Sequence, residues 1–235
     1  LDVSGCEFIG DPSAILIKHS MINLTEIDIS ETHVTDDGII DIIQGCTGLP
    51  YALGMAKGLI SANIASNVLI LIADAYSKII HPKDKVLRTI FGDAGSGLIV
   101  SQSDKPQIHN FVYGTDGSGK DNLIVKNGGL RNPIDPIAKD IVYGSGNVYN
   151  ENHLYMNGPG VFEFTNSVVP DLIQNTLDKN NTTRDDIDMF LFHQANESML
   201  DVLRQKSNID KDGVSSIKIG AFDKFLTFTF SCSHS

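Results

Sequence analysis

Two short apolar segments in this chain each end on a reactive side chain, and a helical pattern follows each of them. The first, residues 38–44, is followed by Cys46 and by an Ala-, Leu- and Gly-rich helical pattern over residues 49–60. The second, residues 188–192, is followed by His193. Strands that alternate with helices predict an α/β fold, because parallel strands must be covered on both faces.

The position of Cys46 at the start of a predicted helix favours nucleophilic chemistry. The first backbone N–H groups of a helix are unpaired and carry about half a positive charge, which stabilises a thiolate. A thiolate attacks thioesters, and a histidine at the end of another strand is a suitable partner. Taken alone, Cys46 or His193 is more often a core-packing residue than a reactive one. The pairing of two such strand-end residues favours the functional interpretation.

The remaining pattern predicts further elements in the first half of the chain. Asp followed by Pro predicts the start of a helix over residues 11–18. Residues 67–73 are continuously apolar, which is typical of a buried parallel strand. The Gly-rich segment 91–97 predicts a flexible turn into a strand over residues 98–101, paired as a hairpin with residues 107–113.

The second half of the chain begins with a segment of weak periodicity. Residues 114–160 are rich in Gly, Asn, Asp and Pro, which predicts a long surface loop region over the site. Apolar residues at helical spacing predict a helix over residues 161–177, kinked or divided at Pro170. Helical spacing also continues over residues 197–205, and the alternating segment 225–230 predicts a strand.

Composition limits the compartment and the class of protein. The chain has 235 residues, 41% of them hydrophobic, which is enough for one large or two small domains. Its longest apolar stretch, residues 68–73, is too short to cross a bilayer, and no secretory leader pattern is present at the start. Cys6, Cys46 and Cys232 have no paired spacing, so neither a disulfide framework nor a metal site is predicted. We therefore expect a cytoplasmic protein.

The net charge of −11 argues against nucleic-acid binding, which needs a basic face. Lys83, Lys85 and Arg88 form a local basic cluster. Such a cluster attracts an acidic carrier or a phosphate, and it is also consistent with a solvated loop. Asp93 lies in a Gly-Asp-Ala-Gly segment, where we interpret it as a structural turn residue.

Four segments in register resemble signature motifs of the β-ketoacyl-acyl carrier protein synthase III family, in the thiolase-like superfamily. The resemblance covers most of the chain, and several motifs in the same order are more specific than one. The segments are Gly45-Cys-Thr-Gly-Leu-Pro-Tyr-Ala-Leu53, Arg88-Thr-Ile-Phe-Gly-Asp-Ala-Gly95, Met156-Asn-Gly158 with Val161-Phe162, and His193-Gln-Ala-Asn196.

The resemblance implies a thiolase-like fold with α/β/α/β/α layers, incomplete at both ends of this chain. It implies an N-terminal half over residues 1–113 that carries Cys46, a loop region over residues 114–160, and a C-terminal half over residues 161–235. It also implies a homodimer without membrane insertion.

The resemblance further implies an acyltransferase that forms carbon–carbon bonds. Cys46 would take an acyl group from acyl-CoA, and malonyl acyl carrier protein would then lose CO2 and attack the acyl-Cys46 thioester. His193 would donate to the thioester oxygen of the developing enolate. Gly158, Phe162 and Asn196 resemble residues that line the channel for the phosphopantetheine arm, although a turn glycine, a core phenylalanine and a structural amide fit them equally. The substrates carry the reactive groups, so no separate cofactor or metal is expected.

The sequence departs from the family pattern in three places. The family has a third catalytic residue, the asparagine of a Gly-Asn-Thr motif, whereas no asparagine follows Asn208 here. The start is also short, so we expect marginal stability or obligate association. Ser198 replaces a basic residue that the family often has near the histidine motif. These departures predict impaired condensation, and they leave open a non-catalytic fragment or subunit, or an acyltransferase to an alcohol or amine.

Overall fold

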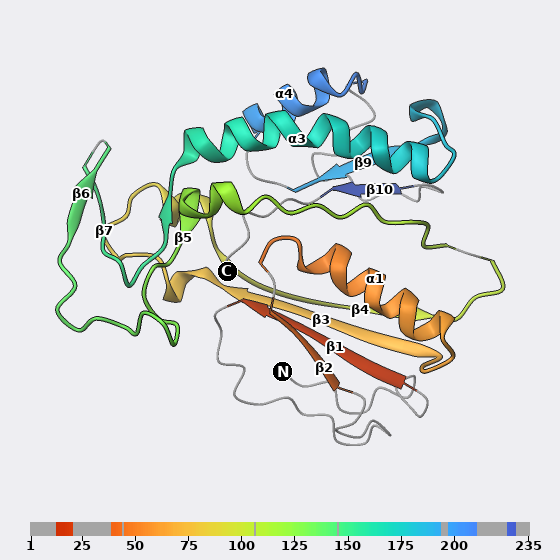
Figure 1. Cartoon of the computed structure of the whole chain (residues 1–235), viewed down its shortest axis with the longest axis horizontal. Helices are drawn as coiled ribbons and strands as arrows, with labels where there is room; N and C mark the ends of the chain where they lie inside the picture. Colours follow the sequence, from red (N-terminus) through yellow and green to blue (C-terminus); the bar gives the residue numbers. More distant parts are fainter. Residues whose placement is uncertain are drawn as a thin grey trace. The chain divides into compact units, whose positions relative to one another are not determined.

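The computed structural model describes residues 13–20, 39–43, 45–105, 107–144, 146–193, 197–210 and 225–228. Contacts divide the chain into two compact units (Figure 1). The first unit runs to Ala75 and includes Asp93–His109, and the second comprises Tyr76–Gly92 and the residues from Asn110 onward. The predicted domain boundaries after residues 113 and 160 stay a prediction.

The first unit is built on a mixed four-stranded sheet. Its strands are β1 (Ser13–Ser20), β2 (Ile39–Ile43), β3 (Asn67–Ala75) and β4 (Asp93–Ser101), in the order β2-β1-β3-β4. β1 pairs in parallel with β2 and β3, and β4 pairs antiparallel with β3. The predicted strands over residues 38–44 and 67–73 are thereby confirmed.

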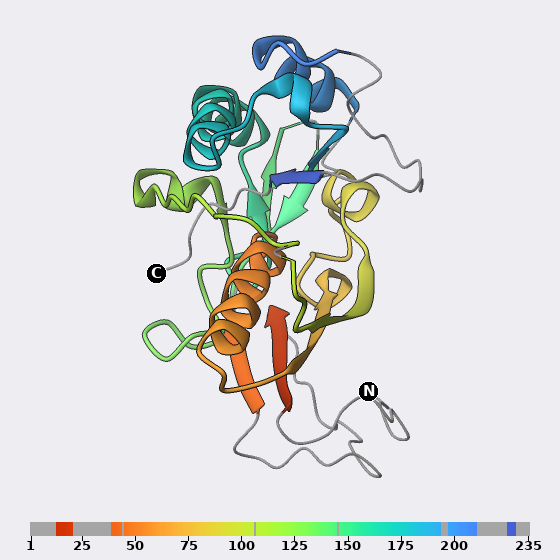
Figure 2. The same cartoon turned by 90° about the vertical axis from the view of Figure 1, so that its right-hand side faces the viewer.

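Helix α1 (Gly48–Ser61) connects β2 to β3 and packs along the sheet (Figures 1 and 2). Its buried positions Ala52 and Ala56 carry small side chains, which let the helix backbone approach the strands closely. They pack against Val68 and Ile70 of β3, which are fully buried. This apolar contact holds the start of α1 against the sheet and so determines where Cys46 lies.

The predicted helix over residues 11–18 is wrong, because β1 occupies Ser13–Ser20. The capping pattern of Asp and Pro favours a helix locally. The four consecutive apolar residues Ala14-Ile-Leu-Ile17 instead suit a strand with a partner on each side, and β1 has β2 and β3 as neighbours. Pairing across the sheet therefore overrides the local helix signal.

The predicted turn at residues 91–97 and the hairpin with residues 107–113 are also wrong. β4 begins at Asp93 and pairs with β3 instead, and residues 107–113 form no strand. Asp93 is therefore a strand residue opposite Ala75, not a turn residue. Glycine is useful here because a Cβ at Gly97 would approach Leu71 Cδ2 to 3.3 Å, so the bare backbone fits β3.

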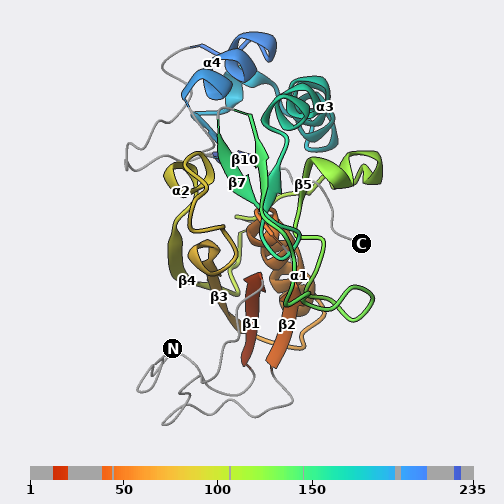
Figure 3. The same ribbon diagram turned by 90° about the vertical axis from the view of Figure 1, so that its left-hand side faces the viewer.

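The second unit has its main core beneath helices α3 (Gly158–Lys179) and α4 (Glu197–Lys206), which pack side by side (Figure 3). The helices bury apolar side chains against β9 (Met189–Phe192), which pairs in parallel with β10 (Phe225–Phe228). These elements agree with the predicted helices and strands. The buried core residues are Val169, Ile173, Leu177, Phe190, Phe192, Met199, Leu200, Leu203 and Ile209.

Pro170 lies inside α3, yet the helix continues through it to Lys179, so the predicted division of the helix is wrong. Proline has no N–H, which leaves the carbonyl of Asn166, four residues earlier, without its helical donor. Lys206 Nζ of α4 lies 3.5 Å from that carbonyl oxygen and donates to it. The neighbouring helix thus supplies the donor that proline removes.

Residues 76–92 and 110–156 contribute short elements to the second unit. Three apolar side chains, Ile80, Leu87 and Leu154, form a smaller core beneath them. The elements are η2 (Tyr76–Lys78), α2 (Leu87–Ile90), η3 (Gly117–Asn122), β5 (Leu123–Ile124), β6 (Ile141–Tyr143), β7 (Asn147–Tyr149) and β8 (Tyr155–Met156), and η4 (Arg184–Asp186) follows α3. β5 pairs with β8 and β6 with β7, both antiparallel.

Candidate active site

Cys46 lies between the end of β2 and the first turn of α1. Thr47 is the N-cap residue of α1, so the cysteine directly precedes the cap. The N–H of Gly48 donates to the carbonyl of Gly45 at 2.9 Å, which closes a tight turn around Cys46. The side chain is half-buried, a state that permits both packing and access to a reagent.

The start of α1 presents a positive electrostatic end to its surroundings. The side chain of the N-cap residue Thr47 makes no cap hydrogen bond, and the first turn contains no acidic residue. The aligned peptide dipoles of α1 therefore act without a compensating carboxylate from the first turn of the helix itself. Such a helix start favours an anion, either a thiolate or the oxygen of a tetrahedral intermediate.

His193 directly follows β9 in the second unit. Its side chain is half-buried, and burial lowers the pKa of the imidazole from its usual value. The cause is desolvation, which disfavours the charged ring. A neutral imidazole keeps one N–H to donate and one nitrogen to accept, so His193 is suited to hydrogen bonding with a polarised oxygen.

Gly158 and Phe162 lie one helical turn apart at the start of α3, and therefore on one face of it. A Cβ at Gly158 would meet no atom within 4 Å, so the space beside it is open. Phe162 is 39% exposed, which leaves its ring available for contact. Asn196 lies outside the described residues.

The predicted site residues thus belong to both units: Cys46 to the first, and Gly158, Phe162 and His193 to the second. Their catalytic and binding roles stay predictions. Among the described residues no cluster of three or more potential metal ligands occurs, and no helix has the length and apolarity to span a membrane.

The basic cluster predicted from the sequence is exposed. Lys83, Lys85 and Arg88 all lie on the surface of the second unit. Lys83 Nζ is 3.4 Å from Asp140 Oδ2, so part of its charge is compensated within the chain. An exposed pair of this kind contributes little to stability.

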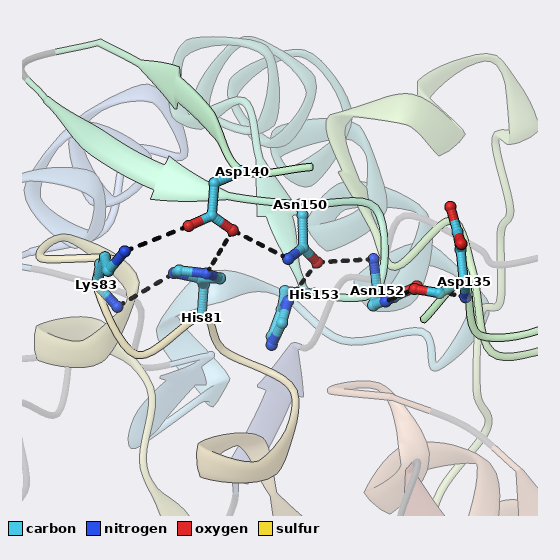
Figure 4. Close-up of polar contacts among 7 residues, drawn as sticks. All are labelled: His81, Lys83, Asp135, Asp140, Asn150, Asn152 and His153. Atoms are coloured by element: carbon cyan, nitrogen blue, oxygen red, sulfur yellow. Dashed lines mark hydrogen bonds and ion pairs between the residues drawn. The ribbon is translucent and has the colours of Figure 1, made fainter. Parts of the chain in front are cut away.

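A polar network around His81 has no signal in the sequence (Figure 4). The His81 side chain is buried, and its Nδ1 accepts from the N–H of Lys83 at 3.2 Å. Because Nδ1 accepts, the proton of the neutral ring is on Nε2, which donates to Asp140 Oδ1 at 3.1 Å. The network joins residues that are 59 positions apart, so local pattern cannot predict it.

Asn150 extends this network toward the following loop (Figure 4). Its Nδ2 donates to Asp140 Oδ1 at 3.2 Å, and this bond is the main cause that lowers the pKa of the carboxyl. Its Oδ1 accepts from His153 Nδ1 at 2.6 Å and from the N–H of Asn152 at 3.2 Å. Asn152 in turn bonds both backbone groups of Asp135. These hydrogen bonds connect three loop segments.

Comparison with protein-family models shows to which family the chain belongs. The model described as 3-Oxoacyl-[acyl-carrier-protein (ACP)] synthase III matches residues 40–117, and its C-terminal counterpart matches residues 177–219. Together the two matches cover about half of the chain, and each contains one of the candidate reactive residues. The chain belongs to the 3-oxoacyl-[acyl-carrier-protein] synthase III family.

Curated members of the synthase III family are similar to this chain in sequence. A β-ketoacyl-[acyl-carrier-protein] synthase III of Campylobacter fetus is 34% identical over 169 residues, which are 71% of this chain and 48% of the relative. A protein of the same name from Clostridium perfringens is 33% identical over 173 residues, 73% of this chain and 51% of the relative. The chain therefore spans about half the length of the curated relatives that it matches.

Solved structures of the synthase III family confirm the predicted fold class. A crystal structure of a 3-oxoacyl-(acyl-carrier-protein) synthase III matches with a TM-score of 0.79 and 36% identity, covering 87% of this chain and 64% of that one. The enzyme from Thermus thermophilus matches with a TM-score of 0.66 and 26% identity, over 86% of this chain and 61% of that one. The fold is α/β and thiolase-like, and this chain contains part of it.

Proposed function

We propose that this synthase III chain is an acyltransferase that forms an acyl-Cys46 thioester from acyl-CoA and condenses it with malonyl acyl carrier protein. The observation that carries the proposal is the place of Cys46, which is half-buried and lies directly before the start of α1, a helix whose first turn contains no acidic residue. A helix start of this kind favours the thiolate that the first step needs. The names of the relatives, β-ketoacyl-[acyl-carrier-protein] synthase III, support the same chemistry.

In the first step, the Cys46 thiolate attacks the carbonyl carbon of acyl-CoA. A backbone N–H at the start of α1 donates to the developing oxyanion. The intermediate then collapses: the bond between carbon and the CoA sulfur breaks, the CoA thiolate takes a proton from solvent, and the acyl group remains on Cys46. The step splits a difficult condensation into two easier reactions.

In the second step, the malonyl thioester loses CO2. The electron pair of the breaking carbon–carbon bond passes into an enolate, whose oxygen accepts a hydrogen bond from His193. Burial keeps that imidazole neutral, so its N–H is available at neutral pH. The enolate carbon attacks the carbonyl of acyl-Cys46, a new carbon–carbon bond forms, and Cys46 leaves as a thiolate.

The phosphopantetheine arm of each substrate is proposed to contact Gly158, Phe162 and Asn196. Open space beside Gly158 and the exposed ring of Phe162 support this role for the start of α3. The acyl carrier protein and acyl-CoA are then the partners, with no separate cofactor. The proposal includes a cytoplasmic homodimer.

Intact-mass measurement after incubation with acetyl-CoA tests the first step. We expect an adduct of one acetyl group on the chain, located on Cys46 by peptide mapping. Cys46→Ala should abolish the adduct, whereas Cys232→Ala, which removes another thiol, should retain it. An adduct that persists in Cys46→Ala, or none on the unaltered chain, contradicts the proposal.

Product analysis separates condensation from transfer to another acceptor. With malonyl acyl carrier protein present, condensation yields CO2 and a β-ketoacyl thioester. Transfer to an alcohol or amine would proceed without the malonyl substrate and release no CO2. Loading of Cys46 with neither product would identify a chain that performs only the first step.

A further inference from the structure

The start of α3 is held by a pair of asparagines, of which the sequence motifs contain only Asn157. The short ladder between β5 and β8 places Leu123 opposite Met156. Because the strands run antiparallel, the residue before Leu123 and the residue after Met156 lie next to each other. These residues are Asn122, the last of η3, and Asn157, the N-cap of α3.

Two hydrogen bonds join the two asparagines, and a third joins Asn157 to the first turn of the helix. The N–H of Asn157 donates to the carbonyl oxygen of Asn122 at 2.7 Å. Asn157 Nδ2 donates to Asn122 Oδ1 at 3.0 Å. Asn157 Oδ1 accepts from the N–H of Gly160 at 3.4 Å, which is the N-cap bond of α3. Both ends of the Asn157 amide are thus engaged, and Asn122 fixes its orientation.

Gly160 fits against this pair without room for a side chain. A Cβ at Gly160 would lie 2.5 Å from Asn122 Oδ1, 2.8 Å from Asn122 Cγ and 2.8 Å from Asn157 Nδ2. All three distances are shorter than real Cβ contacts, so any side chain would separate the two amides. By contrast, the neighbouring Gly158 has nothing within 4 Å of such a Cβ.

The hydrophobic core does not hold this end of the helix. The first buried residue of α3 is Thr165, and its buried apolar residues begin only at Val169. Residues 158–164 therefore extend beyond the part of α3 that packs against β9 and α4. Their position depends on the cap and on Asn122 more than on apolar burial.

We infer that Asn122 is a positioning residue: by orienting the Asn157 cap, it sets where α3 begins and so where Gly158 and Phe162 meet the pantetheine arm of the substrate. This inference rests on the proposed function, since it assigns Asn122 to the same substrate channel. Asn122 itself need not touch the substrate. Its loss should weaken productive substrate binding without changing the reactivity of Cys46.

Kinetics of acetyl loading on Cys46 by acetyl-CoA test the inference on the full chain. In Asn122→Ala, we expect KM to rise about two- to tenfold, the range that corresponds to one lost hydrogen bond, with the maximal loading rate within twofold of the unaltered chain. Asn122→Asp keeps an acceptor for Asn157 Nδ2 and should restore KM. Asn175→Ala, at an exposed position of the same helix, is the control and should leave KM unchanged.

A double substitution tests the contact directly. Gly160→Ala should raise KM because its methyl group separates the amides. In Asn122→Ala with Gly160→Ala, two of the three clashing atoms are absent, so the rise in KM should be smaller than the product of the two single effects. A rise equal to that product would show two independent sites and overturn the inference.

The outcomes separate this inference from the proposed function. If the unaltered chain does not load Cys46, the proposed function fails, and the substrate role of Asn122 fails with it. If the chain loads but Asn122→Ala keeps its KM, the inference alone fails. A fall in maximal rate equal to the loss of folded protein, with KM unchanged, would assign Asn122 a merely structural role and also overturn the inference.

Discussion

The two candidate reactive residues occupy similar positions in their own units but meet opposite electrostatic conditions. Cys46 and His193 each follow a strand, β2 or β9, and each precedes a helix. Helix α1 has no acidic residue in its first turn and no basic residue in its last, whereas α4 has Glu197 at its start and Arg204 and Lys206 at its end.

This difference suits the two residues to different parts of the proposed reaction, although each lies between a strand and a helix. The charges of α4 complement its own dipole, so its start offers less positive potential to a neighbouring group. By contrast, the positive potential at the start of α1 can stabilise an anion. Burial, meanwhile, keeps His193 neutral. A charged nucleophile and a neutral hydrogen-bond donor are the two groups that the proposed reaction requires.

The largest expected effect follows removal of the imidazole. His193→Ala should slow the decarboxylation of a malonyl thioester about 10²- to 10³-fold, as expected for loss of one oxyanion donor. Acyl loading of Cys46 should fall much less, because the donors for that step come from α1. CO2 release measures the first effect and intact mass the second.

His109→Ala, an exposed histidine of the first unit, is the control for this comparison. It should leave both rates unchanged. Equal losses of loading and decarboxylation in His193→Ala would remove the distinction between the two residues.

The pH dependence of unfolding tests the neutral state of His193. In the unfolded chain an imidazole titrates near 6.5, and the folded pKa is lower. Below about pH 6.5 the unfolded state therefore binds more protons than the folded state. As the pH is lowered, the free energy of unfolding decreases until the pH reaches the folded pKa. His193 contributes at most about 1.4 kcal/mol per pH unit.

Denaturant unfolding at several pH values between about 5 and 7.5 measures this slope. His193→Gln should make the slope of the free energy of unfolding against pH shallower. The slope should not become flat, because burial also lowers the pKa of His153, which likewise lowers the free energy of unfolding as the pH is lowered. An unchanged slope in His193→Gln would show that folding does not lower the pKa of His193, and a steeper slope would show that folding raises it.

A smaller effect is expected when the first turn of α1 receives a negative charge like the one that α4 has at its start. Leu49→Glu places a carboxylate in the first turn of α1, and Leu49→Gln is the uncharged control of the same size. The carboxylate should oppose the thiolate by about 0.3–1 kcal/mol, raising the pKa of Cys46 by about 0.2–0.7 relative to the control. Alkylation rates against pH measure the shift, and equal midpoints would show that the dipole of α1 does not act on Cys46.

Prediction from sequence succeeded where burial on both faces leaves a strong local signal. The apolar run at residues 67–73 and the spacing of α3 and α4 identified their elements, and the strand-to-helix junctions placed Cys46 and His193. These patterns come from apolar side chains that pack against neighbouring layers, so the sequence itself carries them.

Prediction failed where a distant partner decides the conformation. β1 became a strand because β2 and β3 lie on either side of it, and the Gly-rich β4 because β3 pairs with it. The contact of Asn122 with Asn157 joins residues 35 positions apart. Asn157 before Gly-Pro is nevertheless a readable N-cap signal, which would have moved the predicted helix start from residue 161 to residue 158.

The pH dependence of Cys46 alkylation by iodoacetamide tests the central claim most directly. Peptide mass spectrometry separates Cys46 from Cys6 and Cys232, so the rate is followed at one sulfur. If the start of α1 stabilises the thiolate, the midpoint of the profile should lie at least about one pH unit below the ordinary value near 8.5. A midpoint at or above about 8.5 would contradict the account.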